Sequence, residues 1–136
     1  MKGALMSGKL SALLVQDQET WFQGLQTILE ELGIDTRRTR SCVESLPLLA
    51  GADPPHLVFT DTQLPDGTWA DLLRLSAKAH GLVKVIVVSR VVDIALYLDV
   101  LDAGGFDFVV PPFYPAEVAH IVRCATQGGL ELAKAA

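Results

Sequence analysis

The sequence contains, at residues 83–89, the stretch VKVIVVS, in which only Lys84 and Ser89 are polar. Its valine and isoleucine side chains are branched at the β-carbon and favour extended backbone. An apolar run without alternating polar positions is typical of a strand buried on both faces, as in parallel sheets covered by helices. The stretch therefore predicts a central strand of a parallel sheet.

Four shorter segments on either side of this stretch have the length of further strands. They are residues 11–16, 34–38, 56–61 and 106–110, the second being the weakest because its last residues are charged. Helical patterns separate the strands; in the first, Leu25, Ile28 and Leu29 recur at three- and four-residue spacing. Five strands alternating with five helices predict right-handed crossovers and an α/β fold, a doubly wound parallel sheet with flanking helices.

Local signals predict where several helices begin and end. Ser41 and Thr68 are each followed three residues later by an acid, which is the capping-box pattern of a helix start. Gly33 is placed to end the first helix in a left-handed conformation, and Gly81 to end the helix that follows Thr68. We expect another helix over residues 92–103.

The composition indicates a single domain. At 136 residues, we expect a flexible lead-in (1–10), one domain (11–128) and a C-terminal tail (129–136). The formal net charge of -5 disfavours DNA binding by this chain, since nucleic-acid surfaces require clustered Lys and Arg. No apolar stretch is long enough for a membrane span or a signal-peptide core, so we expect a cytoplasmic protein with no membrane contact.

Polar residues follow the predicted strands at the edge where ligands bind in open parallel sheets. Gln16 and Asp17 come after the first strand, Asp61 ends the third, Ser89 ends the fourth and Pro111 follows the fifth. The sequence has neither a glycine-rich phosphate loop after the first strand nor a GxSxG nucleophile elbow. A flavin- or nucleotide-binding enzyme of flavodoxin-like fold is therefore disfavoured, and cofactor absorbance in the pure protein would be its sign.

Four ordered segments resemble the receiver domain of bacterial response regulators, the phospho-accepting proteins of two-component signal transduction. They are LLVQDQE (13–19), LVFTDTQLPDG (57–67), VIVVSR (85–90) and DAGGFDFVVPPF (102–113). The resemblance covers residues 11–127. It implies a flavodoxin-like (βα)5 fold and a signalling domain rather than an enzyme, with at most self-phosphorylation and slow self-dephosphorylation.

The resemblance also implies roles for individual residues. Asp61 would accept a phosphoryl group from a histidine kinase or a phosphotransfer protein. Asp17, Asp61 and the main-chain carbonyl of Gln63 match the family's Mg²⁺ ligands, Ser89 matches its phosphoryl-binding hydroxyl, and Phe108 matches its switching aromatic. This chemistry is consistent with the residue types, because a carboxylate can attack phosphorus and the transferred group requires Mg²⁺ and positioned donors to balance its charge.

Two positions depart from the family pattern. Gln16 stands where receivers usually have the first of two acids, so we expect weakened Mg²⁺ binding rather than none. Pro111 stands where a lysine usually pairs with the acceptor carboxylate. Arg90 either replaces that charge or remains a solvated residue at the rim. The bond between Pro111 and Pro112 is a candidate for the cis form.

Simpler interpretations stay open at this stage. Asp61 would otherwise be a turn or capping acid, Asp17 an N-cap and Phe108 a core aromatic. Gln16 and Pro111 also favour a pseudo-receiver, a protein-interaction module of the same fold that acts without phosphorylation. Testing whether the chain itself becomes phosphorylated on Asp61 separates the phospho-accepting receiver from the pseudo-receiver.

One predicted helix has more apolar surface than a single contact requires. Residues 92–101, VDIALYLDVL, are apolar around most of the helix circumference. An excess apolar stripe of this kind is typical of a protein interface. We expect a homodimer contact or an output-protein contact through residues 92–127.

Overall fold

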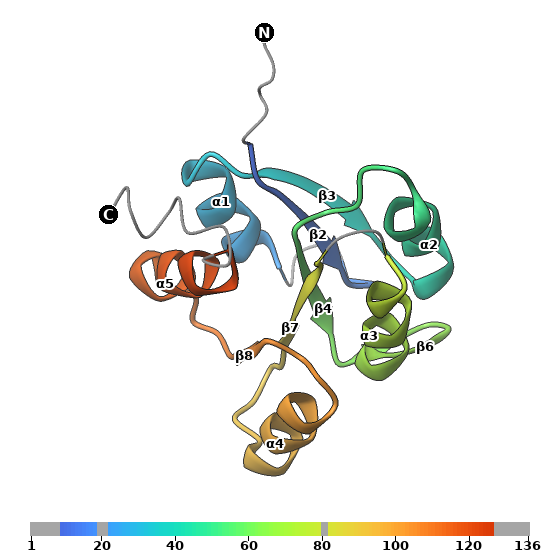
Figure 1. Cartoon of the computed structure of the whole chain (residues 1–136). Helices are drawn as coiled ribbons and strands as arrows, with labels where there is room; N and C mark the ends of the chain where they lie inside the picture. The colour runs from blue at the N-terminus through green and yellow to red at the C-terminus, as the bar shows by residue number, and fades with distance from the viewer. Residues whose placement is uncertain (1–8, 19–21, 80–81, 127–136) are drawn as a thin grey trace, which may run out of the picture.

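The computed structural model describes residues 9–18, 22–79 and 82–126 (Figure 1). Its strands are β2 (Ser11–Val15), β3 (Asp35–Thr39), β4 (Leu57–Asp61), β5 (Gln63–Leu64), β6 (Gly67–Thr68), β7 (Lys84–Val88) and β8 (Asp107–Val109). Its helices are α1 (Gln23–Glu31), α2 (Cys42–Ala50), α3 (Trp69–Ala77), α4 (Ile94–Asp102) and α5 (Pro115–Thr126). The expected tail at 129–136, and all but the last two residues of the expected lead-in at 1–10, lie outside the described residues.

Five of the strands form one parallel sheet in the order β3-β2-β4-β7-β8. This order and the flanking helices confirm the predicted doubly wound α/β fold. The direction of winding changes between β2 and β4, so the topological switch point lies where these two strands end. Val15 pairs in register with Thr60 there, which makes Gln16 and Asp61 the next residues on the two strands.

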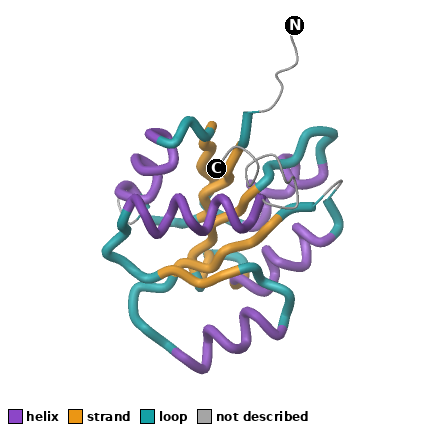
Figure 2. The backbone as a smooth tube through the Cα atoms, turned by 60° about the vertical axis from the view of Figure 1, so that its left-hand side comes forward, coloured by secondary structure: helices purple, strands orange, loops and turns teal. Residues whose placement is uncertain are grey.

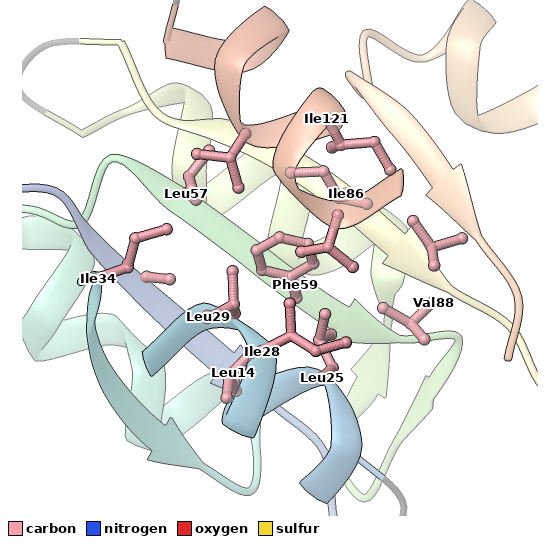
Figure 3. Packing of buried hydrophobic residues seen from close by; sticks show 14 of the residues in the cluster. Leu14, Leu25, Ile28, Leu29, Ile34, Leu57, Phe59, Ile86, Val88 and Ile121 are labelled. Atoms are coloured by element: carbon pink, nitrogen blue, oxygen red, sulfur yellow. The ribbon is translucent and has the colours of Figure 1, made fainter. Parts of the chain in front are cut away.

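Apolar side chains alternate between the two faces of the sheet, and helices cover both faces (Figure 2). On one face, Leu14, Phe59 and Ile86 pack against α1 and α5 (Figure 3). On the other, Leu13 and Val58 pack against α2 and α3. Burial on both sides explains why the central strands are continuous apolar runs.

The predicted helix signals have clear structural counterparts. The Ser41 hydroxyl accepts a hydrogen bond from the Glu44 N–H at 3.0 Å, and Thr68 begins α3 in a complete capping box. Gly33 has a φ of 84°, as its predicted role requires. α3, however, ends at Ala77, before the predicted stop at Gly81, which is outside the described residues.

Helix α4 differs from the other helices in its burial. Val100 is its one buried residue, whereas Ile94 is 65 % exposed and Leu98 is 53 % exposed. The apolar surface predicted for residues 92–101 is therefore accessible in the structure. Among the described residues, no helix has the length and apolar content to cross a membrane.

Candidate functional site

The switch point of the sheet holds a pocket that gathers several of the predicted site residues. Asp17, Asp61, Gln63 and Arg90 line it together with Gln18, Thr62, Leu64 and Pro65. These residues come from three loops that are far apart in the chain, after β2, β4 and β7. The fold thus brings the two predicted acids and the predicted replacement cation to one edge of the sheet.

Asp61 is fixed in place at the end of β4. Its side chain is only 10 % exposed. One carboxylate oxygen, Oδ1, accepts a hydrogen bond from the Thr62 N–H at 2.7 Å, while Oδ2 lies 3.6 Å from Arg90 Nη2. The carboxylate therefore has one oxygen held by backbone and the other beside a guanidinium.

The loop after Asp61 is a small hairpin that the sequence analysis did not predict. Strands β5 and β6 pair antiparallel, with Gln63 opposite Thr68 and Leu64 opposite Gly67. Two-residue strands are too short to show a periodic pattern, so the only sequence signal was the turn residues Pro-Asp-Gly at 65–67. A Cβ at Gly67 would lie 2.5 Å from Asp71 Oδ2, so a larger residue there would displace the carboxylate that accepts from the Thr68 N–H.

Asp66 ties this hairpin to the start of α2. Its carboxylate accepts hydrogen bonds from the backbone N–H groups of Cys42 and Val43, both at 2.9 Å. These two bonds lower the pKa of Asp66 below its ordinary value. Burial, with the Asp66 carboxylate nearby, raises the pKa of the Cys42 thiol to about 11, so this thiol is not a nucleophile at neutral pH.

At the end of β2, one residue is buried and the next is exposed. Gln16 is 4 % exposed, and its Oε1 is a buried polar atom without a hydrogen-bond partner in the described part of the chain. Asp17 Oδ1 lies 3.8 Å from Arg40 Nε. This ion pair was not predicted, although adjacent parallel strands bring the residues after β2 and β3 to the same edge.

The donor atoms on this edge suit an oxygen-seeking cation. Two carboxylates, the unpartnered amide oxygen of Gln16 and backbone carbonyls are the hard oxygen ligands that Mg²⁺ prefers. No group of three or more His, Cys, Asp or Glu side chains with metal-binding geometry occurs within residues 9–18, 22–79 and 82–126. The site therefore fits Mg²⁺ with a small number of charged ligands.

The β7 side of the pocket contains the predicted cation. Arg90 Nη2 donates a hydrogen bond to Gln18 Oε1 at 2.9 Å, and the Arg90 side chain is 48 % exposed. It thus bridges the loop after β2 to Asp61.

The other residues predicted on this side have contacts of their own. The Ser89 hydroxyl donates to the Val91 carbonyl oxygen at 2.8 Å. Phe108 is half-buried and makes an edge contact with Tyr97 of α4, with ring centroids 5.8 Å apart. The peptide bond before Pro112 is cis, as predicted.

Comparison with known proteins was consistent with this architecture. A family model described as the response regulator receiver domain matches residues 12–123. The response regulator protein PilR of Pseudomonas aeruginosa is 31% identical over 114 residues, 84% of this chain and 25% of that protein. The KDP operon transcriptional regulatory protein KdpE of Escherichia coli is 30% identical over 115 residues, 85% of this chain and 50% of that protein. The chain thus spans a quarter to a half of these relatives.

Solved structures show the same fold. A crystal structure of a response regulator receiver domain protein from Clostridium thermocellum aligns with a TM-score of 0.77 and 21% identity, covering 90% of this chain and 98% of that one. A CheY-like receiver domain protein from Methanospirillum hungatei aligns with a TM-score of 0.74 and 21% identity, covering 94% and 99%. Both have a chain length close to that of the domain described above.

Proposed function

This chain belongs to the response regulator receiver domain family, and from that premise we propose that it accepts a phosphoryl group on Asp61 from a histidine kinase or a phosphotransfer protein. Receiver domains are signalling domains, and we propose that this one passes its signal on through a protein surface rather than by enzymatic turnover. The observation that carries the proposal is the placement of Asp61, a largely buried carboxylate that opens into the switch-point pocket with a guanidinium 3.6 Å away.

The proposed step is a transfer from nitrogen to oxygen. A carboxylate oxygen of Asp61 attacks the phosphorus of a phosphohistidine and forms a P–O bond. The P–N bond breaks, and the imidazole nitrogen keeps the electron pair and takes up a proton. Arg90 lies on the side of Oδ2 and offsets the negative charge on the transferred group's oxygens.

Receiver domains generally bind Mg²⁺ for this reaction, and we propose that this one does so weakly. Asp17, Asp61 and the main-chain carbonyl of Gln63 would hold the ion, and Gln16 Oε1, next to Asp17 in the chain, is a further neutral oxygen. When bound, Mg²⁺ supplies positive charge to the phosphoryl oxygens. A site with two carboxylates binds it less tightly than a site with three.

A pseudo-receiver is the second candidate, and two observations favour it. Pro111 puts neither a charge nor a donor at the end of β8. The Ser89 hydroxyl is already bonded to the Val91 carbonyl, so contact with a phosphoryl group requires that bond to open. In this alternative, the domain binds its partner without modification of Asp61.

Chemical phosphorylation of the whole chain separates the two candidates. We expect incubation with Mg²⁺ and acetyl phosphate to add one phosphoryl group, detected by intact-protein mass spectrometry, and Asp61→Ala to abolish it. Asp53→Ala, which removes an exposed carboxylate from another loop, is the matched control and should be modified like the wild type. The pseudo-receiver would be favoured if the wild-type chain stayed unmodified by acetyl phosphate and its NMR chemical shifts did not change on addition of beryllofluoride.

We also propose that residues 92–127 supply the protein-contact surface, for a second copy of the chain or for an output protein. The supporting observation is the row of exposed apolar residues on and before α4. Its members are Val91, Val92, Ile94, Tyr97, Leu98 and Leu101. Light scattering at high concentration tests the second copy: self-association should weaken in Leu98→Glu and persist in Val43→Glu, a control on exposed α2 surface.

A further inference from the structure

The proposed metal ligand Asp17 already has a cation from its own chain beside it. Arg40 Nε lies 3.8 Å from Asp17 Oδ1, and Arg40 Nη2 donates a hydrogen bond to the Asp17 backbone carbonyl at 3.3 Å. The guanidinium fork thus contacts one residue at both side chain and main chain, a geometry that lysine would not reproduce.

The backbone that presents Arg40 is anchored on both sides. Before it, the Thr39 carbonyl accepts a hydrogen bond from the Gln16 N–H at 3.1 Å, which joins the ends of β3 and β2. The Arg40 N–H itself donates to Glu44 Oε1 at 2.8 Å, and Ser41 caps α2 directly after it. Arg40 therefore leaves from a fixed point beside Asp17 rather than from a free loop.

An unsatisfied oxygen lies in the same place. Gln16, Asp17 and Arg40 line a hollow together with Arg38, Thr39 and Glu44. Gln16 is 4 % exposed, and its Oε1 has no hydrogen-bond partner among the described residues. A buried amide oxygen is costly to leave unpaired, so it indicates a cation or a water at this position.

The two proposed metal-binding carboxylates already have counter-ions within the chain. Two carboxylates, Asp17 and Asp61, are each in an ion pair with an arginine, Arg40 and Arg90 respectively. Mg²⁺ that binds between the carboxylates would meet both guanidinium groups at short range and be repelled by them. Arg40 contacts Asp17, which is proposed to bind the metal, whereas Arg90 contacts Asp61, which is proposed to accept the phosphoryl group.

We propose that Arg40 is an intramolecular counter-ion that a divalent cation must displace from Asp17, so that Arg40 limits the affinity of the site for Mg²⁺. This inference rests on the metal-binding role of Asp17 in the proposed function. It assigns part of the weakened metal binding to an arginine after β3, in addition to the missing acid at Gln16. Displacement would also free Arg40 to change its contacts when the metal binds.

The test is a titration of the whole chain with Mg²⁺ alone, measured by isothermal titration calorimetry, so that no phosphorylation is needed. We expect Arg40→Gln to lower the Mg²⁺ dissociation constant by roughly two- to fivefold, the effect that one exposed ion pair supports. Arg37→Gln is the matched control, because it removes the same charge from β3 at a residue that lines a different hollow. Arg40→Lys, which keeps the charge but not the two-point contact to Asp17, should fall between the wild type and Arg40→Gln.

A second measurement uses the unmodified protein. The Nε–H resonance of Arg40 in a nitrogen-15 spectrum should shift along the same Mg²⁺ titration. An unchanged dissociation constant in Arg40→Gln, equal tightening in Arg37→Gln, an unmoved Arg40 resonance or the absence of Mg²⁺ binding would each overturn the inference. If Arg40→Gln binds Mg²⁺ more tightly while Asp61 of the wild type stays unmodified, the phospho-acceptor role is wrong but this inference still holds.

Discussion

The two sides of the switch-point pocket are built differently. On the acceptor side, the hairpin after Asp61 is fixed by its own backbone pairing, by the Asp66 bonds to α2 and by the capping box at Thr68. On the cation side, Arg90 is half-exposed and reaches Asp61 across the pocket from the end of β7. One side is rigid through local hydrogen bonds, whereas the other depends on one long side chain.

One of the two departures from the family pattern, Pro111, falls on the cation side. The acceptor side keeps the Asp61 segment with its Pro-Asp-Gly turn, whose Asp66 is hydrogen-bonded to the start of α2. On the cation side, Pro111 stands where the resemblance implies a lysine, and Arg90 lies in the loop after the neighbouring strand β7. An ion pair requires only that two charges lie close together, whereas each hydrogen bond requires its own geometry. A cation can therefore stand at either of two neighbouring strand ends more readily than a hydrogen-bond network can.

The largest effect should come from removing the cation. We expect Arg90→Gln to slow the acetyl-phosphate modification of Asp61 by about tenfold, because a charge-assisted contact to the transferred group is lost and the half-exposed position moderates that loss. Mass spectrometry at successive times gives the rate. Arg123→Gln on α5 is the control for net charge, and an equal rate in Arg90→Gln and the wild type would show that Arg90 does not replace the lysine.

The next effect concerns the rigidity of the acceptor side. Thr68→Ala removes the N-cap of α3, which is also the last residue of the hairpin, and should lower the free energy of unfolding by about 1 kcal/mol. Urea denaturation measures it. Thr27→Ala, at an exposed position within α1, should change stability by less than about 0.5 kcal/mol. Equal losses in the two variants would mean that the capping box adds nothing to the hairpin's fixation.

A smaller effect should follow from returning a cation to β8. In the Arg90→Gln background, Pro111→Lys should recover about threefold of the modification rate, because the added charge lies at the neighbouring strand end. The same time course measures it, with Pro112 left in place. Pro111→Gln in that background controls for loss of the proline. Recovery by both variants would show that backbone, not charge, limits the β8 side.

The sequence predicted the layers of the fold well because burial leaves a periodic record. The run at 83–89 became β7, and Gly33 has the positive φ that a helix end required. Leu32 is an exception, since it has the spacing of the apolar face of α1 but is 43 % exposed. It is the C-cap of the helix, one residue beyond its last turn.

The candidate site was predicted less completely. Strand ends could be located, and this was sufficient to place Asp17, Asp61 and Arg90 around one pocket. Which partner each side chain contacts depends on rotamers and loop paths that no spacing records. The Arg40 contact to Asp17 and the bonds of Asp66 to α2 were therefore missed, although Asp17 and Asp66 stood in quoted segments; Arg40 lay between a predicted strand and a predicted helix.

The smallest expected effect is a pH dependence on the acceptor side. The two backbone N–H bonds lower the pKa of Asp66 below its ordinary value of 3.8, so the folded protein binds this proton less readily than the unfolded chain. The stabilising contribution is then complete above the ordinary value and is lost as the pH falls through the lowered one. In urea denaturation, Asp66→Asn should be less stable than the wild type at neutral pH and should converge with it in acid. Asp53→Asn controls for the lost charge. If the stability difference between Asp66→Asn and the wild type were the same at neutral and acid pH, Asp66 would hold α2 without using its charge. The rigidity of the acceptor side would then come from the hairpin and the α3 cap alone.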